Sequence, residues 1–245
     1  EIKKGSFTVI TGPSGAGKTT LCKAMTGIVP YYMGGRYSGD VKINGESTKG
    51  KRVSDIAMRV GFIMEDYESQ LVSLTAGEEI AFSLLNHGFA PHEVKERTRQ
   101  ALEDVGLPGR ESYQLDELSG GQRQRLLLAA TLAVHPEIIV LDEPTSFLDV
   151  RYKLELLAIL ERMARKKHIT VIMSLHEIDL AQKVSDKIIC VKGDTIAHYG
   201  KPEEVFKEDT IRSLYEIDNG SFDPAFGSIE LPKIEGEPEV FVISS

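Results

Sequence analysis

The sequence is poor in cysteine and has no long apolar run, and these two absences exclude several kinds of protein. Its 245 residues include only two cysteines, Cys22 and Cys190, which is too few for a disulfide framework or a paired-cysteine metal site. This cysteine usage fits a reducing compartment, so we expect a cytoplasmic protein. No apolar run approaches the roughly 18 residues of a membrane-spanning helix, and no signal peptide is expected.

Positive charge is also scarce. The 29 Lys and Arg residues are outnumbered by 37 Asp and Glu residues, which gives a formal net charge of −8. Non-specific nucleic-acid binding depends on clustered cations that meet phosphates, so we expect no nucleic-acid partner. The chain also lacks internal repeats and long low-complexity tracts. Its length and its 41% hydrophobic content are sufficient for a sizeable core.

Short apolar runs alternate with helical segments along the chain. We predict strands at residues 7–11, 60–64, 138–141, 169–175 and 187–191. The alternation of strands and helices predicts an α/β fold with a mostly parallel sheet. The alternating segment 38–44 ends in Asn44-Gly45, a hairpin signal that predicts an additional antiparallel β part.

The middle of the chain has a helical pattern, which predicts an inserted α-helical subdomain. Pro91 is expected to begin a helix there, and Gly106 to end it. A further amphipathic helix is predicted at 150–167, and its inward residues are expected to be Leu154, Leu157, Ala158 and Leu160.

These patterns divide the chain into three parts. We assign residues 1–64 and 137–215 to a nucleotide-binding core and 65–136 to the helical subdomain. Residues 216–245 form a Gly-, Pro- and acid-rich extension of unknown role, with an apolar run at 240–243. The sequence does not begin with Met, and residues 1–5 look like the interior of a sheet, so we expect the natural start to lie upstream.

The first chemical motif follows the predicted strand at 7–11. It has the pattern G-x-x-x-x-G-K-[ST] and opens a helix, which is the context of a P-loop. Its backbone N–H groups and the helix N-terminus suit phosphates, with Lys18 on the β- and γ-phosphates and the Thr19 hydroxyl on Mg²⁺. The predicted ATP-binding residues are Gly12, Pro13, Ser14, Gly15, Ala16, Gly17, Lys18, Thr19 and Thr20.

A second motif places two carboxylates directly after the apolar strand at 138–141. Asp142 suits the Mg²⁺ shell, and Glu143 suits a general base that polarises the attacking water. Together with a P-loop, this pair predicts a P-loop NTPase with a RecA-like core.

A third motif, Leu118-Ser119-Gly120-Gly121-Gln122, precedes a helix, with Ser119 as a plausible N-cap and its glycine N–H groups open to an anion. It resembles the signature motif of ATP-binding cassette (ABC) ATPases, which other P-loop classes lack. Residues 146–149 resemble the D-loop of that family, and His176 resembles its switch histidine. The resemblance extends from Glu1 to about Tyr215.

The resemblance implies an ATPase that uses ATP and Mg²⁺ in a head-to-tail dimer. In such a dimer, the signature residues Ser119, Gly120, Gly121 and Gln122 would serve the partner's nucleotide. Glu143 and His176 would be the catalytic residues, and Thr19 and Asp142 would hold the metal. The dimer partner would be a second ABC ATPase subunit, identical or homologous.

Two departures from the family pattern concern the nucleotide site. Glu65 stands where the family usually has a Gln that touches Mg²⁺, so we include Glu65 among the metal ligands. A carboxylate can bind a hard cation but adds negative charge beside ATP. The aromatic residue that stacks on adenine in the family would lie upstream of the P-loop, and we expect it to be absent from this sequence.

Residues 28–35 and 70–82 resemble those of energy-coupling-factor (ECF) importer ATPases. This implies import of a vitamin or a metal ion through separate transmembrane permease subunits, at the cytoplasmic face of the cell membrane. Two alternatives are a non-transport ABC ATPase and a regulatory ATP-binding subunit with altered turnover. Non-transport ABC ATPases of the chromosome type carry long coiled coils between the P-loop and the signature. Here this interval is helical but has no sustained heptads, which disfavours that type. The presence of both Glu143 and His176 disfavours a regulatory subunit with altered turnover.

Overall fold

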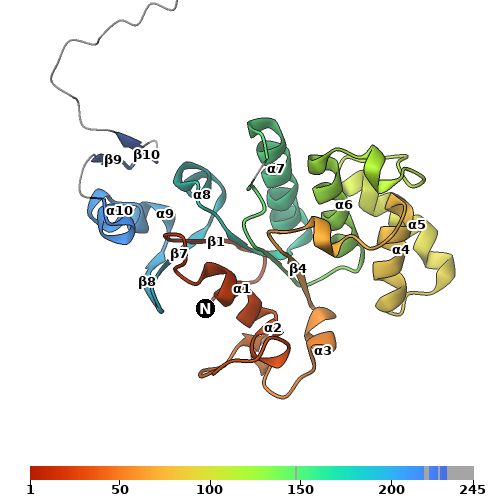
Figure 1. Cartoon of the computed structure of the whole chain (residues 1–245), viewed down its shortest axis with the longest axis horizontal. Helices are drawn as coiled ribbons and strands as arrows, with labels where there is room; N and C mark the ends of the chain where they lie inside the picture. Colours follow the sequence, from red (N-terminus) through yellow and green to blue (C-terminus); the bar gives the residue numbers. More distant parts are fainter. Residues whose placement is uncertain (147, 218–220, 226, 231–245) are drawn as a thin grey trace, which may run out of the picture.

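A six-stranded sheet forms the centre of the protein (Figure 1). The computed structural model describes residues 1–146, 148–217, 221–225 and 227–230. The strand order is β4-β5-β6-β1-β7-β8. The first five of these are parallel, and β8 (Thr195–Gly200) pairs with β7 in antiparallel fashion. The parallel strands are β1 (Phe7–Thr11), β4 (Val60–Ile63), β5 (Ile138–Leu141), β6 (Thr170–Ser174) and β7 (Lys187–Lys192). The predicted α/β class with a mostly parallel sheet is confirmed.

Both faces of the sheet are covered, and the side chains of β1 show how. Phe7 and Val9 belong to one apolar cluster, whereas Ile10 belongs to another. This follows from the two-residue period of a strand, which sends successive side chains to opposite faces. Figure 1 shows α1 (Lys18–Met25) on one side of the sheet and α7 (Val150–Lys167) and α8 (Ile178–Val184) on the other.

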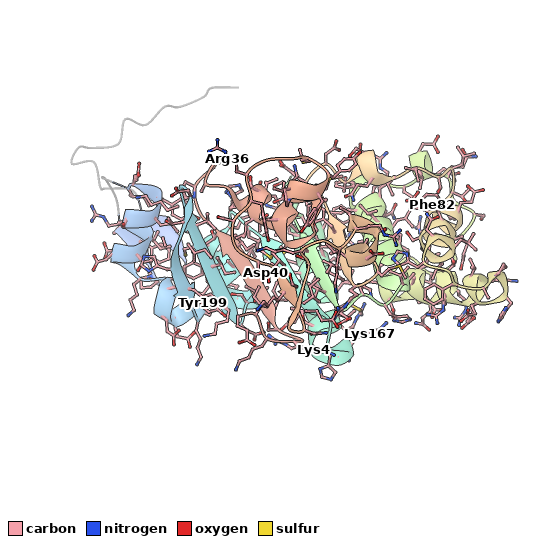
Figure 2. The ribbon with its side chains drawn as sticks, turned by 90° about the horizontal axis from the view of Figure 1, so that it is seen from below. Lys4, Arg36, Asp40, Phe82, Lys167 and Tyr199 are labelled. Carbon is pink, nitrogen blue, oxygen red and sulfur yellow. The ribbon has the colours of Figure 1, made fainter. Side chains whose placement is uncertain are left out.

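Residues 65–136 form helices that extend to one end of the molecule (Figures 1 and 2). These are α4 (Ala76–Asn86), α5 (Pro91–Asp104) and α6 (Gly120–Ala133), with the short 3₁₀ turns η1 (Glu68–Gln70) and η2 (Leu115–Glu117). Helix α5 begins at Pro91 as expected, and Gly106 follows its end with φ 74°. The helical nature of this region is therefore confirmed, while its boundaries as a subdomain stay a prediction.

Helix α7 has the predicted bounds, but two of its four predicted inward residues are wrong. Leu157 and Leu160 are buried, whereas Leu154 is 53% exposed and Ala158 is exposed. The buried stripe also includes Leu156. Leu154 and Ala158 each lie two positions from Leu156, which is about 200° around a helix, so they face outward.

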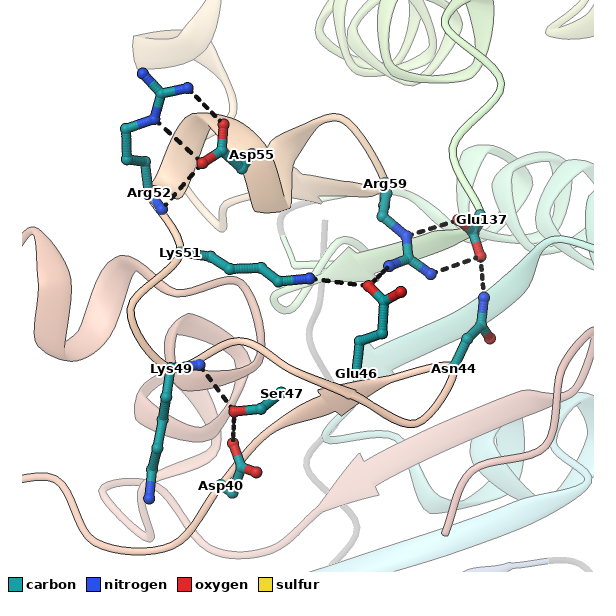
Figure 3. A network of polar contacts seen from close by, with 10 residues as sticks. All are labelled: Asp40, Asn44, Glu46, Ser47, Lys49, Lys51, Arg52, Asp55, Arg59 and Glu137. Atoms are coloured by element: carbon teal, nitrogen blue, oxygen red, sulfur yellow. Dashed lines mark hydrogen bonds and ion pairs between the residues drawn. The ribbon is translucent and has the colours of Figure 1, made fainter.

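The predicted hairpin is present and is attached to the sheet by an ion-pair network (Figure 3). Strands β2 (Lys42–Ile43) and β3 (Glu46–Ser47) are joined by Asn44-Gly45, both with positive φ, as a tight two-residue turn requires. Arg59, just before β4, lies 2.7 Å from Glu137 and 3.2 Å from Glu46. The Arg59 hydrogen bond lowers the pKa of Glu137. The network holds the hairpin against the amino ends of β4 and β5.

The remaining elements are short. They comprise α2 (Ile28–Tyr31), α3 (Val53–Ala57), α9 (Pro202–Val205), α10 (Glu208–Tyr215) and the antiparallel pair β9 (Ser221–Asp223) and β10 (Ser228–Glu230). Residues 1–5, which look like the interior of a sheet in the sequence, form no strand, because β1 begins at Phe7. The apolar run 240–243 lies outside the described residues. No described helix combines the length and apolarity needed to cross a membrane.

Candidate active site

The P-loop connects β1 to α1 and closely approaches strand β7. A Cβ atom at Gly12 would lie 2.1 Å from the carbonyl oxygen of Val191, so only glycine fits there. Lys18, in the first turn of α1, is 4% exposed and donates hydrogen bonds to the carbonyls of Gly12 (3.1 Å) and Pro13 (3.2 Å). The side chain of Lys18 therefore folds back over the loop that precedes its own helix.

The backbone of the P-loop presents several free donors. The N–H groups of residues 14, 15, 17, 18, 19 and 20 have no acceptor among the described residues. Ser14, Gly15 and Thr20 are exposed. Such a set of N–H groups at a helix N-terminus suits an anion, since the helix dipole adds to the individual donors. The structure therefore places the predicted phosphate-binding residues together in a suitable geometry.

Asp142 and Glu143 follow β5, and one hydroxyl from β6 connects them. Ser174 donates a hydrogen bond to Asp142 Oδ1 (2.8 Å) and accepts one from the Glu143 N–H (2.7 Å). Asp142 is 2% exposed and Ser174 is fully buried. Glu143 has a φ of 48°, a left-handed conformation that costs a non-glycine residue about 1–2 kcal/mol. The Ser174 hydrogen bond helps to hold Glu143 there.

The side chain of Glu143 meets both His176 and Lys18. Its Oε1 atom is 2.6 Å from His176 Nε2 and 3.6 Å from Lys18 Nζ. Glu143 is 15% exposed and His176 is 39% exposed, so the carboxylate is largely enclosed while the imidazole reaches solvent. The two predicted catalytic residues and the P-loop lysine are therefore brought together at one edge of the sheet.

Besides Ser174, the residues around this centre include Glu177, which the sequence did not single out either. Glu177, next to His176, accepts a hydrogen bond from Thr145 (3.1 Å) and one from Lys153. Burial raises the pKa of Glu177, but the hydrogen bond from Lys153 and the bond from Thr145 outweigh it, and the net pKa is lowered. These contacts fasten the start of the predicted D-loop, of which Phe147 lies outside the described residues.

The predicted signature motif lies at the start of α6, away from the P-loop. Ser119 is the N-cap, and it forms a reciprocal pair of hydrogen bonds with Gln122, 3.4 Å and 3.0 Å long. Gly121 packs against Tyr152 of α7, where a Cβ would lie 2.9 Å from the ring. No hydrogen bond or ion pair between described residues joins 119–122 to the P-loop. Within one chain, the two motifs are thus separate.

Glu65 follows β4 at the same edge as Asp142, whose N–H bonds to the carbonyl of Ile63. The side chain of Glu65 is exposed, and no hydrogen bond or ion pair reaches it from any described residue. Nearby, Gln70 accepts a hydrogen bond from the Met64 N–H (2.8 Å) and donates one to the Phe62 carbonyl (3.1 Å). The role of Glu65 as a metal ligand stays a prediction.

The donor set fits a nucleotide and Mg²⁺. Open backbone N–H groups and Lys18 suit phosphates, while Asp142 and Thr19 are oxygen ligands of the kind that Mg²⁺ prefers. In the part of the chain that the structure describes, no group of three or more His, Cys, Asp or Glu side chains could hold a metal ion. A Mg²⁺ bound mostly through phosphates and water needs only one or two carboxylates.

A parallel sheet with a P-loop after β1 and an acidic pair after β5 defines a P-loop nucleotide hydrolase. The chain belongs to the ABC transporter family, whose profile matches residues 1–146. A Pyrococcus abyssi protein named as an ABC transporter ATP-binding protein is 38% identical over 206 residues, which cover 84% of this chain and 74% of that protein. This family assignment confirms the resemblance seen in the motifs, and with it an ABC ATPase.

Other relatives are longer. A protein of Caldanaerobacter subterraneus subsp. tengcongensis, named in the same way, is 40% identical over 208 residues, 85% of this chain. A Methanosarcina acetivorans protein is 37% identical over 216 residues, 87% of this chain. The match spans only 36% and 35% of those two proteins.

Solved structures give the same result. CbiO1 of Clostridium perfringens, described as part of the ABC transporter complex CbiONQ, has a TM-score of 0.77 at 28% identity and matches 87% of this chain and 84% of its own. A dimeric ATP-binding cassette in a post-hydrolysis state, bound to ADP and phosphate, has a TM-score of 0.69 at 27% identity and matches 82% and 87%.

Proposed function

We propose that this chain is the ATP-hydrolysing subunit of an importer of the vitamin or metal-ion type. It acts in a head-to-tail dimer with an identical or homologous subunit, bound to separate permease subunits at the cytoplasmic face of the membrane. The importer type rests on the resemblance of residues 28–35 and 70–82 to ECF ATPases and on the likeness to CbiO1. The observation that carries the head-to-tail dimer is the separation of the P-loop from the signature motif. Ser119 is exposed, and no hydrogen bond or ion pair between described residues ties the signature to its own P-loop, so the signature can serve the nucleotide of a second chain.

In this proposal the P-loop N–H groups and Lys18 bind the ATP phosphates. Thr19, Asp142 and Glu65 are the ligands for Mg²⁺, which neutralises charge on the phosphates when bound. Glu143 accepts the proton of the attacking water, and His176 orients the Glu143 carboxylate through their short contact. That contact favours turnover over a purely regulatory role. Ser119, Gly120, Gly121 and Gln122 bind the partner's nucleotide.

An exposed apolar group on the helical end supports a permease partner. Phe82 and Leu85, on α4, are each 51% exposed, and Val72 and Leu74 just before α4 are 64% and 79% exposed. Figure 2 shows Phe82 at the helical end of the molecule, far from Tyr199. The buried carboxylate of Glu79 accepts hydrogen bonds from the Val72 and Ser73 N–H groups. This holds the segment before α4 in place while its apolar side chains stay outward.

The dimer is tested by dilution. Specific ATPase activity should fall as the protein is diluted, because each competent site needs two chains. Activity that stays constant over a thousandfold dilution, with a monomeric mass throughout, would refute the shared site.

The transport role is tested by co-purification with membrane subunits expressed from the neighbouring genes. Leu74→Ser with Phe82→Ser should release the chain from these subunits while MgATP affinity is unchanged. The matched control is Leu154→Ser, since Leu154 is 53% exposed but lies on α7. Equal retention of both variants would exclude the helical end as the docking surface.

A further inference from the structure

The segment between β4 and α4 contacts two parts of the site at once. Within this segment, Gln70 makes two hydrogen bonds to the backbone of residues 62 and 64, which close residues 65–69 into a loop. These two hydrogen bonds hold the two ends of the loop 65–69 together. The loop is therefore attached to the end of β4, the strand that leads to the predicted Mg²⁺ ligand Glu65.

The middle of the same loop touches the signature motif. The Tyr67 hydroxyl donates a hydrogen bond to the Gly120 carbonyl, 3.2 Å away. Burial raises the pKa of Tyr67, and Glu68 adds to the rise. Tyr67 also packs on the main apolar core. Beside it, Glu68 lies 3.1 Å from Arg123 of α6, but this pair is partly exposed to solvent and contributes little by itself.

A hydrogen bond that holds the Gly120 carbonyl also fixes the direction of the N–H group of the next residue, Gly121. The Gly120 C=O and the Gly121 N–H belong to one planar peptide and point in opposite directions. When the Tyr67 hydroxyl sets the direction of the Gly120 carbonyl, it therefore sets the direction of the Gly121 N–H as well. Gly121 is buried against Tyr152, which leaves no room for a Cβ, and its N–H has no acceptor among the described residues.

We propose that Tyr67 is a positioning residue that aims the Gly121 N–H at the nucleotide of the partner subunit. The inference rests on the proposed composite site. It assigns to Tyr67 an effect on the partner's ATP rather than on the ATP bound to its own P-loop. Because Tyr67 is two residues from Glu65, the same loop connects the metal side of one site to the signature side of the other.

The test is a mixed dimer with one competent site. One chain carries Lys18→Ala, which disables its P-loop, and the other carries Ser119→Asp. Asp keeps the N-cap of α6 but sets a negative charge toward the phosphates. The remaining site combines the P-loop of the Ser119→Asp chain with the signature of the Lys18→Ala chain. The mixture should be more active than either chain alone.

Tyr67→Phe is then added to one chain at a time. On the Lys18→Ala chain it should lower ATPase activity about 3- to 10-fold, the range expected for one lost hydrogen bond. On the Ser119→Asp chain it should leave activity within about twofold of the parent pair. An equal loss on both chains, or a loss only on the Ser119→Asp chain, would overturn the assignment.

Two controls separate this role from general damage. Tyr113→Phe removes a hydroxyl from the same helical region that bonds to no described residue, and it should have no effect on either chain. Tyr67→Phe alone should keep the MgATP affinity of the single chain. If the parent pair shows no activity beyond its separate chains, the composite site itself is wrong, and the role of Tyr67 falls with it.

Discussion

Replacing Glu143 by Gln isolates the charge of the proposed general base, because the amide has the same shape. The carboxylate now lies 2.6 Å from His176 Nε2 and 3.6 Å from Lys18 Nζ. Loss of general-base action costs about 10²- to 10⁴-fold, or about 3–5 kcal/mol in the barrier. We therefore expect turnover to fall at least 100-fold while the fold is preserved.

Nucleotide binding should respond in the opposite direction. Glu143 and the ATP phosphates compete for Lys18, and the attraction between two charges at 3.6 Å is about 4.6 kcal/mol at an effective dielectric constant of 20. Removing the carboxylate charge frees Lys18 for the phosphates. Glu143→Gln should bind MgATP as tightly as the parent protein or more tightly, and it should accumulate as an ATP-bound dimer.

The assay combines single-turnover ATPase measurement, isothermal titration with MgATP and gel filtration in ATP. Glu46→Gln is a matched control, since Glu46 lies on the hairpin at the opposite ends of the strands. Near-normal turnover of Glu143→Gln would refute the assignment of the base. A large loss of MgATP affinity would refute the competition for Lys18.

Three further substitutions test the other parts of the site. Lys18→Ala should weaken MgATP binding as well as turnover, because a cation facing the phosphates is lost; unchanged affinity by titration would contradict this role. Glu65→Gln should raise the Mg²⁺ concentration for half-maximal ATPase and keep activity at saturating Mg²⁺ within about tenfold, a barrier change of about 1.4 kcal/mol; superimposable Mg²⁺ titrations would remove Glu65 from the metal site. Ser174→Ala leaves Asp142 and the Glu143 N–H each without a partner, so the free energy of unfolding should fall by about 1–3 kcal/mol and turnover should fall with it; an unchanged urea midpoint and rate would show that neither hydrogen bond matters.

The features that sequence predicted correctly are those that local pattern determines. The P-loop has a fixed glycine spacing, and the strand at 138–141 is apolar throughout, so both could be placed within a residue. The edge strand β8 was missed because its first five residues are exposed and show no alternation of apolar and polar side chains. Leu154 and Ala158 were misplaced because an amphipathic pattern gives the existence of a helix more reliably than the exact rotation of its buried face.

Contacts between distant segments could not be predicted in the same way. Ser174 is a single serine at the end of an apolar strand, a position that does not by itself indicate a function. Only the pairing of β5 with β6 shows that Ser174 contacts Asp142. The link from Tyr67 to Gly120 spans two 3₁₀ turns and two α-helices, so no spacing rule connects them. The one available signal for Ser174 was its position at the carboxyl end of a strand, where polar residues of α/β proteins gather.

The Ser174 hydroxyl, which hydrogen-bonds to both Asp142 and Glu143, makes the geometry of the proposed catalytic centre depend on the register of β5 and β6. Leu141 pairs with Met173, and the next residues along the two segments are Asp142, directly after β5, and Ser174, the last residue of β6. A slip of β6 by one residue would turn Ser174 to the other face of the sheet, because side chains alternate along a strand. Both hydrogen bonds would then be lost at once. Core substitutions far from the nucleotide that loosen this pairing should therefore lower turnover before they unfold the protein.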